Sequence, residues 1–423
     1  MEKYSSYKES GFAWMGQIPS HWETRRFRFL LAENSTQNTE LKERKQLQFK
    51  YGDIVPKANQ SEDKDVLDTI KKYTVVAPGD IMINGLNLNY DFISQRVAQV
   101  QEPGVITSAY VSLRPLEGAN SKYYTYYMKA MDAQKMFHGM GSGVRLTLSY
   151  DNLKNLFFPY PSPEEQDAIV AYLDAATAKI DEAIAQQQRM IDLLNERKQI
   201  LINNALTNGL GNSFASILLG EKPNTFPIPK GWALIPLKAK VSFINGYAFD
   251  SDSFENDGEM AVIRISNIAD GSICFDDIVY VEKDRALDSF ITRKGDLLIA
   301  MSGATTGKVG FDLEGGSYIN QRVGIIRSDC QKWIYYWLQT SFFKEYVYLS
   351  ALGSAQPNIS SSGIKNFRIL FPQDDEYEKI VNNLDSVCAE IDRTLTLCNQ
   401  QIDLLQERKQ IIINDVVTGK VKV

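Results

Sequence analysis

An internal repeat constrains the fold of this chain more than any other feature. The segment IDLLNERKQILIN (residues 191–203) returns 211 positions later as IDLLQERKQIIIN (residues 402–414), with 11 of 13 residues identical. The same offset carries Asp181 onto Asp392. Because this offset is half of the 423 residues, we interpret the protein as two copies of one unit.

Each repeated segment is predicted to be a long helix. Apolar residues follow three-four spacing from Ile169 to Leu201 and again from Ile380 to Ile412. Prolines followed by acidic residues open both segments, which suits a helix N-terminus. About 44 residues at about 1.5 Å each make a helix of roughly 65 Å, with a long apolar seam that needs a partner. We expect the two helices to pair with each other, antiparallel and related by a pseudo-twofold axis. Two independent core helices in separate domains are the alternative.

The composition is that of an ordinary globular protein, with 44% apolar and 23% charged residues. No apolar run approaches 18 residues, and the first ten residues lack a signal-peptide core. The four cysteines show no metal-type pairing, so a reduced, cytoplasmic location is expected. With two histidines, both in the first half, a symmetric histidine-based metal site or catalytic dyad is excluded.

The net charge of −6 is uneven along the chain. Residues 161–211 carry 8 acidic against 4 basic side chains, and residues 372–423 carry 10 against 6. The globular parts are therefore close to neutral, which permits local basic surfaces for nucleic acid. The acidic helices are expected to face protein rather than phosphate.

The repeat divides the chain into two globular units, each followed by a long helix. The predicted regions are 1–160, 161–209, 210–371 and 372–423, with a Gly/Ser/Asn-rich linker at 208–226. Each unit shows short strands around a Gly-Asp turn (74–85 and 293–303) and then an aromatic helix (122–137 and 332–348). This order predicts an α+β fold with two mixed α/β units, and neither a doubly wound sheet nor a TIM barrel. The aromatic helices are interpreted as core helices rather than base-stacking platforms.

Three motifs that suggest catalysis fail on inspection. Gly303 to Lys308 resembles a phosphate-binding loop but lacks its first glycine and the hydroxyl residue after the lysine. Phe158-Pro-Tyr-Pro161 lacks the polar residue and adjacent prolines of adenine methyltransferases. Glu196-Arg-Lys198 and its repeat resemble a nuclease Glu-x-Lys but lie on predicted helices without an upstream Pro-Asp. We therefore expect no catalytic residue and no metal site.

Several segments together resemble the DNA-specificity subunits of type I restriction–modification systems. They are GFAWMGQIPSHWE, INGYAFDS, VIRISNIADG, GDLLIAMSGATTGKVG, the two helices with ERKQ, and the Gly-Ser loops that precede each helix. The resemblance covers nearly the whole chain. The first unit departs from the second, because it has NGLNLNYDFISQRV (84–97) where the second has GATTGK.

The resemblance implies a non-catalytic DNA-binding protein. Two target recognition domains would each read one half of an asymmetric bipartite site in double-stranded DNA. The helices would form an antiparallel coiled coil that sets the half-site spacing and docks two methylation subunits, through which restriction subunits join. No cofactor is expected on this chain, since S-adenosylmethionine, ATP and Mg would be bound by the partner subunits. No membrane partner is implied.

Base reading requires forked donors and amides, such as Arg for guanine and Asn or Gln for adenine. Candidate readers in the first unit are Asn84, Asn87, Asn89, Gln95, Arg96, Ser142 and Arg145. Candidates in the second are Asn245, Tyr247, Arg264, Asn267, Ser302, Thr305, Thr306, Lys308, Asn320, Gln321, Arg322, Gln356 and Asn358. Possible phosphate contacts are Arg25, Arg26, Arg28, Lys42, Arg44 and Lys45. For each of these, a turn, strand-edge or solvated surface role is the alternative.

Two other functions remain open. The chain could itself be a methyltransferase or nuclease, in which case it would transfer a methyl group or cleave DNA alone. It could instead be a duplicated scaffold that joins protein partners without reading bases.

Overall fold

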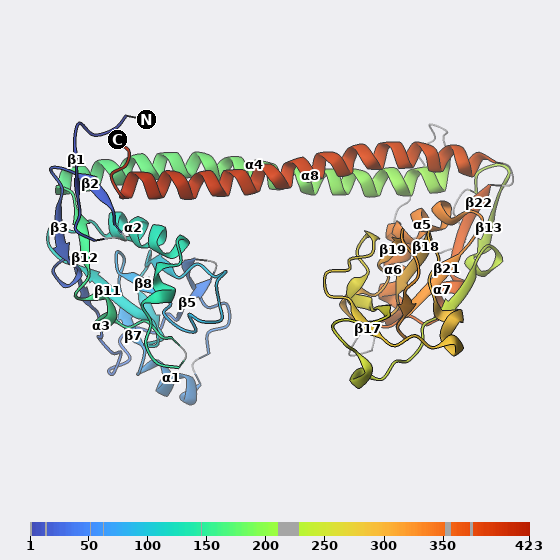
Figure 1. The fold of residues 1–423 in the computed structure, drawn as a ribbon, viewed down its shortest axis with the longest axis horizontal. Helices are drawn as coiled ribbons and strands as arrows, with labels where there is room; N and C mark the ends of the chain where they lie inside the picture. The colour runs from blue at the N-terminus through green and yellow to red at the C-terminus, as the bar shows by residue number, and fades with distance from the viewer. Residues whose placement is uncertain are drawn as a thin grey trace. The chain divides into compact units, whose positions relative to one another are not determined.

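The computed structural model describes residues 2–12, 15–50, 52–61, 63–144, 146–209, 228–351, 357–372 and 375–423. The chain forms two compact units, both of mixed α/β structure (Figure 1). Unit 1 comprises Met1–Gln187 and Asn399–Val423, and unit 2 comprises Gln188–Cys398. The division differs from a simple cut into successive regions because each long helix contributes one part to each unit.

The long helices are α4 (Pro163–Asn208) and α8 (Glu376–Val417). The remaining helices of unit 1 are α1 (Lys64–Ile70), α2 (Ser121–Ala133) and α3 (Tyr150–Leu153). Its strands are β1 (Tyr7–Glu9), β2 (Gln17–Pro19), β3 (Glu23–Arg26), β4 (Leu31–Glu33), β5 (Leu47–Lys50), β6 (Asp53–Pro56), β7 (Thr74–Val76), β8 (Ile81–Ile83), β9 (Val97–Gln99), β10 (Gly104–Ile106), β11 (Val111–Pro115) and β12 (Phe157–Tyr160).

The remaining helices of unit 2 are α5 (Gln331–Gln339), α6 (Ser341–Ala351) and α7 (Ser361–Asn366). Its strands are β13 (Trp232–Pro236), β14 (Ser242–Asn245), β15 (Met260–Ile263), β16 (Gly271–Ser272), β17 (Val279–Val281), β18 (Asp296–Ala300), β19 (Val309–Asp312), β20 (Tyr318–Ile319), β21 (Val323–Arg327) and β22 (Arg368–Pro372).

The central sheets of the two units follow one plan. Unit 1 has the strand order β4-β11-β8-β9, and unit 2 has β14-β21-β18-β19 extended by β16. All pairings are antiparallel except β16 with β19. Each unit also has an antiparallel ribbon, β3 with β12 or β13 with β22, whose second strand runs toward a long helix. The duplication seen in the sequence therefore extends to the topology.

An ion pair recurs at the same corner of both sheets. The Arg114 guanidinium donates to the Asp80 carboxylate at 2.9 and 2.8 Å. The Arg327 guanidinium donates to the Asp296 carboxylate at 2.7 and 2.6 Å. Asp80 directly precedes β8 and Asp296 is the first residue of β18, and the pairing raises the pKa of both guanidinium groups. Such bidentate pairs tie the turn to the neighbouring strand.

The aromatic helices are core helices, as the sequence predicts. In α2, the rings of Tyr123, Tyr124 and Tyr127 are buried. The second aromatic segment differs from the prediction, because it forms two helices, α5 and α6, rather than one. The buried Thr340 separates them: its hydroxyl donates to the carbonyl of Trp337 at 2.7 Å and accepts from the amide of Phe343 at 3.2 Å. That threonine closes one helix and opens the next, a local competition that apolar spacing does not reveal.

The ends of the long helices follow local chemistry. The Ser162 hydroxyl accepts from the amide of Glu165 at 3.3 Å and caps α4. Gly209 and Gly419, with φ of +69° and +73°, follow the C-terminal ends of α4 and α8. Despite their length, neither of these helices, nor any other within the described stretches, is apolar enough to cross a membrane.

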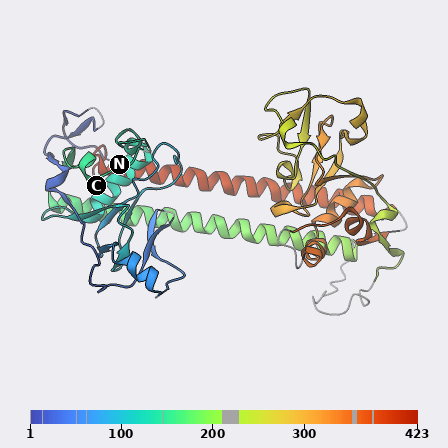
Figure 2. The same cartoon turned by 90° about the horizontal axis from the view of Figure 1, so that it is seen from below.

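Within each unit, parts of α4 and α8 lie side by side (Figure 2). In unit 1, the Lys409 ammonium lies 2.7 Å from the Asp181 carboxylate. In unit 2, the Lys198 ammonium lies 2.6 Å from the Asp392 carboxylate. The repeat offset of 211 relates Asp181 to Asp392 and Lys198 to Lys409, so these ion pairs are equivalent.

Each globular part is anchored on a long helix by one repeated contact. In unit 1, the hydroxyl of Tyr126 donates to Asp174 at 2.8 Å, and Lys122 pairs with the same carboxylate. In unit 2, Tyr336 donates to Asp385 at 2.7 Å, and Lys332 pairs with it. The hydrophobic cores continue onto the helices, through Leu173 and Val416 in unit 1 and through Leu206 and Leu384 in unit 2. The globular part of each unit therefore packs on segments of both long helices.

Candidate nucleic-acid interface

In both units, the loop after the central strand is hydrogen-bonded to the loop that precedes the long helix. In unit 1, Leu88 N donates to Leu146 O at 3.3 Å and Leu148 N donates to Gly85 O at 2.9 Å. In unit 2, Gly303 N donates to Pro357 O at 3.0 Å and Ile359 N donates to Met301 O at 2.9 Å. The repeat offset of 211 carries residues 146 and 148 onto 357 and 359. The two units therefore build one loop pair in the same way.

We call these pairs the reading loops. They comprise residues 84–96 with 141–148 in unit 1 and residues 301–308 with 357–359 in unit 2. The backbone hydrogen bonds that join the two loops are equivalent in both units. The loops after the central strands, residues 84–96 and 301–308, differ in length and sequence. Gly85 is required for the close approach in unit 1, since a Cβ atom there would lie 2.6 Å from Leu148 O.

The unit 1 reading loops gather most of the predicted polar readers. Asn87, Gln95 and Ser142 are exposed, and Asn87 has a φ of +54°. Asn84 and Asn89 are half-buried; the side-chain oxygen of Asn84 accepts from Leu86 N at 3.2 Å, and that of Asn89 has no partner in the described structure. Arg145 lies outside the described residues.

Arg96 has a different role from the one predicted for it in this conformation. Its side chain is buried, and its guanidinium donates to the carbonyl oxygens of Asn84 at 3.0 Å and Leu86 at 2.8 Å. A third bond reaches the carbonyl oxygen of Asp91 at 2.6 Å. The Arg96 amide donates to Asp132 at 2.7 Å, a carboxyl whose pKa is raised by burial. Arg96 therefore organises the loop from inside and presents no donor to a ligand here.

In unit 2, the predicted readers gather at one end of the central sheet. The end of β18 lies against the start of β21, with Ala300 opposite Val323, and β14 ends beside them at Asn245. The Thr305 hydroxyl donates to Ile265 O at 3.1 Å, which joins the turn at residues 264–267 to the reading loop. Tyr247 N donates to Ile319 O at 3.0 Å. Segments far apart in the sequence thus meet at one edge.

The exposure of the unit 2 candidates is uneven. Six are exposed: Asn245, Tyr247, Lys308, Gln321, Arg322 and Asn358. Five are half-buried: Arg264, Ser302, Thr305, Thr306 and Asn320. Asn267 is buried, accepting from Arg264 N at 2.9 Å and donating to Cys274 O at 3.1 Å, so it serves the turn in this conformation. Gln356 lies outside the described residues.

The structure adds an apolar surface that sequence reasoning missed. On the unit 1 reading loops, Ile93 is 94% exposed, Tyr90 77%, Phe92 55% and Val144 96%. The Phe92 ring stacks on His138, with centroids 4.6 Å apart. We call Tyr90, Phe92 and Ile93 the apolar tip. Its sequence signal was the run Tyr-Asp-Phe-Ile in a polar loop.

Most of the predicted phosphate contacts have partners within unit 1. Arg25 lies on β3, with its guanidinium 3.6 Å from the Tyr160 ring centroid and an ion pair to Glu23. Arg26 and Arg28 lie over the rings of Phe157 and Phe29. Lys42 and Lys45 form ion pairs with Glu40 and Glu102, and Arg44 also has an interaction within the chain. All six cationic residues are at least partly exposed, so phosphate could compete for them.

The motifs that suggested catalysis have structural roles. Residues 303–308 lead into strand β19 rather than a helix, so they do not form a phosphate-binding loop. Residues 157–160 form β12, paired with β3. Lys198 and Lys409 lie on the long helices in the ion pairs described above. Among the described residues, no group of three or more His, Cys, Asp or Glu side chains could hold a metal ion.

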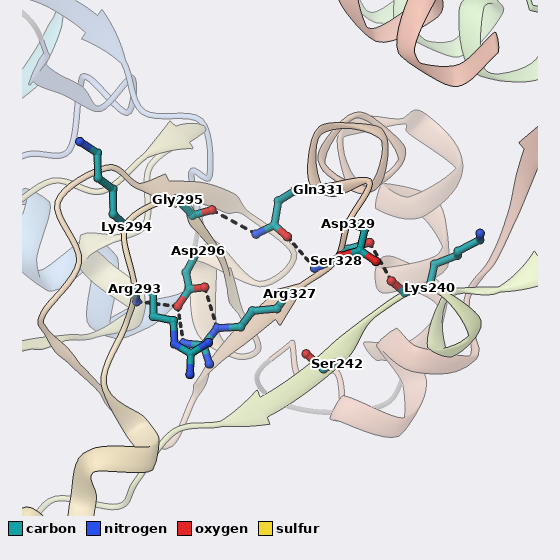
Figure 3. A pocket seen from close by; sticks show the side chains of 10 residues that line it. All are labelled: Lys240, Ser242, Arg293, Lys294, Gly295, Asp296, Arg327, Ser328, Asp329 and Gln331. Atoms are coloured by element: carbon teal, nitrogen blue, oxygen red, sulfur yellow. Dashed lines mark hydrogen bonds and ion pairs between the residues drawn. The ribbon is translucent and has the colours of Figure 1, made fainter. Parts of the chain in front are cut away.

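A basic cleft lies at the opposite end of the unit 2 sheet from the reading loops (Figure 3). It surrounds the Arg327–Asp296 ion pair at the start of β18, where Ser242 pairs with Arg327 across the strands. Its other lining residues are Lys240, Arg293, Lys294, Gly295, Ser328, Asp329 and Gln331. Gln331 is bonded to Gly295 O and Ile326 O, so part of the lining already has partners. The cleft is therefore separate from the reading loops.

Comparison with known proteins identifies one family. The family described as Type I restriction modification DNA specificity domain matches residues 19–190 and 229–403. These matches fall one in each repeat and together cover most of the chain.

Two similar proteins are named as type I restriction enzyme specificity subunits. The chain is 24% identical over 368 residues to the Type I restriction enzyme MjaVIII specificity subunit of Methanocaldococcus jannaschii, covering 83% of this chain and 81% of that protein. It is 23% identical to the putative type I restriction enzyme MjaX specificity subunit of the same organism, over 99% of this chain and 98% of the relative. A solved structure concerned with assembly and conformational transition of the type I R-M system is similar in fold, with a TM-score of 0.68 at 15% identity, covering 96% of this chain and 99% of that chain.

Proposed function

The chain belongs to the type I restriction–modification DNA specificity family, and from this premise we propose how its two units read DNA. It is a specificity subunit, which recognises a DNA sequence and is not itself catalytic. We propose that unit 1 reads one half of an asymmetric bipartite site and unit 2 reads the other half.

The observation that carries this proposal is the pair of reading loops. The backbone bonds that hold them are the same in both units, whereas residues 84–96 and 301–308 differ in length and sequence. A duplicated protein that binds one ligand twice has no reason to vary its binding loops in this way. Two different half-sites require such variation on a constant frame.

The proposed base readers are the predicted polar side chains of the reading loops and of the segments beside them, without Arg96 and Asn267, whose side chains bond inward. Asn and Gln match adenine and Arg matches guanine, with discrimination of about 1–3 kcal/mol for each good pair. In unit 1 the proposed readers are Asn84, Asn87, Asn89, Gln95, Ser142 and Arg145. In unit 2 they are Asn245, Tyr247, Arg264, Ser302, Thr305, Thr306, Lys308, Asn320, Gln321, Arg322, Gln356 and Asn358.

The long helices are proposed to form an antiparallel coiled coil that fixes the half-site spacing. The equivalent pairs Asp181–Lys409 and Lys198–Asp392 support this arrangement. From the first pair to the second, α4 advances by 17 residues and α8 goes back by 17, as one continuous antiparallel register requires. The spacing between half-sites would then be a geometric constant of the helices.

The outer faces of the same helices are proposed to dock two methylation subunits, through which restriction subunits join. In unit 2, Leu193 and Ile200 of α4 are 61% and 49% exposed. In unit 1, Leu404 and Ile411 of α8 are 63% and 51% exposed. The repeat relates Leu193 to Leu404 and Ile200 to Ile411, so these two apolar stripes are equivalent. Spacing of seven residues places both members of a stripe on one helix face, as a partner helix would need.

The chemistry is assigned to the partners. S-adenosylmethionine, ATP and Mg would be bound by the methylation and restriction subunits, while this chain supplies recognition. A scaffold that only joins protein partners would also use the apolar stripes, but it would not need divergent reading loops.

Selection from a random duplex library tests the proposal. The chain is purified together with its methylation subunit, and the bound duplexes are sequenced. We expect two different defined segments separated by a fixed number of undefined base pairs. A palindrome, one contiguous segment or no enrichment would contradict bipartite reading.

A helix insertion tests the spacing role. One heptad is inserted after Arg189 of α4 and another after Gln400 of α8, positions that the repeat relates to each other. Because seven residues add about 10 Å of helix and base pairs rise by about 3.4 Å, the gap should lengthen by about three base pairs with both half-sites unchanged. A heptad inserted in α4 alone is the control, since it breaks the register and should abolish the fixed gap.

A further inference from the structure

The apolar tip of unit 1 has a built support, and the described residues of the unit 2 reading loops carry no counterpart. The connection from β8 to β9 spans residues 84–96, longer than the connection from β18 to β19 at residues 301–308. The corresponding loop of unit 2 carries Thr305, Thr306 and Lys308. The additional residues of the unit 1 loop contain the apolar tip. The tip therefore lies in a segment where the two copies differ.

The loop is held in one conformation by Arg96. Its guanidinium lies inside the loop and bonds three carbonyl oxygens, those of Asn84, Leu86 and Asp91. The nearest carboxylate oxygen, Oδ2 of Asp91, is 3.9 Å away, so the buried charge is satisfied mainly by the backbone bonds of its two terminal nitrogens, while Nε has no partner among the described residues. Burying a charge in this way is costly unless its hydrogen bonds are made, so the arrangement favours one loop shape.

The tip itself is a turn closed by Asp91. One oxygen of its carboxylate accepts from Ile93 N at 3.1 Å and from Ser94 N at 2.9 Å. These bonds lower the pKa of Asp91 to about 2, so the group is ionised at neutral pH. With the backbone fixed on its inner side, the Ile93 side chain projects into solvent.

The duplication indicates what the tip binds. The apolar stripes of the long helices recur in both copies, as expected for two identical protein partners. The apolar tip lies among polar candidates such as Asn87 and Gln95, and the described residues of the unit 2 reading loops show no such tip. A surface that serves one half-site should appear in one copy. The apolar group that base edges expose in the major groove is the thymine methyl, so this is the group that an apolar tip can recognise.

We propose that Ile93 and its neighbours in the apolar tip contact thymine methyl groups in the half-site read by unit 1, with Arg96 as the positioning residue. This inference rests on the proposed function. It assigns A·T pairs to the positions under the tip. It also explains why the tip is held rigidly, because apolar contact depends on shape rather than on directional bonds.

Uracil substitution tests the proposal, because it removes only the methyl group. The complex with the methylation subunit is titrated with its selected duplex, in which single thymines are replaced by uracil. Since one buried methyl corresponds to about fourfold in affinity, we expect at least one thymine of the unit 1 half-site to show a loss of about that size. Ile93→Ala should remove this loss of affinity. Uracil substitution in the unit 2 half-site should change the affinity of the wild type and of Ile93→Ala by the same factor.

Three further variants separate the proposal from general damage. Leu313→Ala truncates another exposed apolar residue, on unit 2, and should leave the uracil effect unchanged. Arg96→Met removes the loop bonds and should relax discrimination in the unit 1 half-site alone. Arg114→Met breaks an ion pair elsewhere in unit 1 and should lower stability without relaxing that half-site.

Three outcomes would overturn the inference. Uracil could have no effect anywhere in the unit 1 half-site, or Ile93→Ala could weaken thymine and uracil duplexes equally, as a wedge between base pairs would. Ile93→Ala could also leave DNA binding intact and weaken the protein complex, which would make the tip a protein contact. If the complex selects no defined unit 1 half-site at all, the proposed function itself fails.

Discussion

The apolar stripe of unit 2 gives the sharpest prediction about assembly. The double variant Leu193→Ser and Ile200→Ser removes two side chains that are 61% and 49% exposed. Because full burial of such a side chain contributes about 1.5–3 kcal/mol, covering the exposed half of each should contribute about 1–1.5 kcal/mol. Together the substitutions should weaken docking at this stripe by about 2–3 kcal/mol, or roughly 30- to 150-fold. The free chain should keep its stability, because exposed residues add little to folding.

Native mass spectrometry of the complex with methylation subunits measures this effect. At a protein concentration that saturates both sites of the wild type, the variant should hold one methylation subunit instead of two. The equivalent pair, Leu404→Ser and Ile411→Ser on unit 1, should give the same stoichiometry, and the quadruple variant should hold none. Asn195→Ser, exposed on nearly the opposite side of α4, is the control. Unchanged occupancy in the quadruple variant would refute the docking role of the stripes.

Three further predictions concern single side chains. Arg327→Leu leaves the buried Asp296 carboxylate with a bond from the Arg293 amide at 2.7 Å and should destabilise unit 2 by about 3 kcal/mol. Arg114→Leu should lower stability less, because the similarly buried Asp80 carboxylate keeps bonds from the Ala77 amide at 3.0 Å and from Asn34 Nδ2 at 3.2 Å. Chemical denaturation measures both losses, and equal losses would contradict this argument. A thiol reagent should modify the exposed Cys274 quickly in the native chain, whereas Cys330 and Cys388 should react only after unfolding, because both are buried and burial raises the pKa of their thiols. Peptide mass mapping identifies the modified cysteines. Hydrogen bonds from Ser94 and Ile93 lower the pKa of Asp91 to about 2, so its contribution to the stability of the tip should be complete above pH about 4 and lost as the pH falls through about 2. The NMR chemical shift of the Ser94 amide should show that transition, and Asp91→Asn should abolish it.

The duplication and the helices were predictable because they depend on local sequence. Ile169 and Leu173 lie in the core of unit 1 as the three-four spacing predicted, and α4 begins at Pro163 where the acidic cap suggested. The aromatic residues Tyr123 and Trp333 are buried as expected. The break at Thr340 was missed, since a hydroxyl that caps two helices leaves no trace in apolar spacing.

The reading loops show where sequence reasoning stops. A list of polar residues could not separate the exposed Gln95 from its buried neighbour Arg96, because the difference depends on which carbonyl groups the folded loop turns inward. For the same reason Asn267 resembled a reader although it holds a turn. Ile93 was passed over because apolar residues are usually buried. Its exposure follows from the closed turn at Asp91, a tertiary feature.

The central claim is that each unit reads its own half of the site. The direct test replaces residues 228–372 with the corresponding segment of a relative of different specificity, co-expresses the hybrid with the methylation subunit, and maps N6-methyladenine across the genome by single-molecule sequencing. We predict a two-part motif in which one half changes while the other half and the gap stay the same. A change in both halves, or no change at all, would contradict independent reading by the two units.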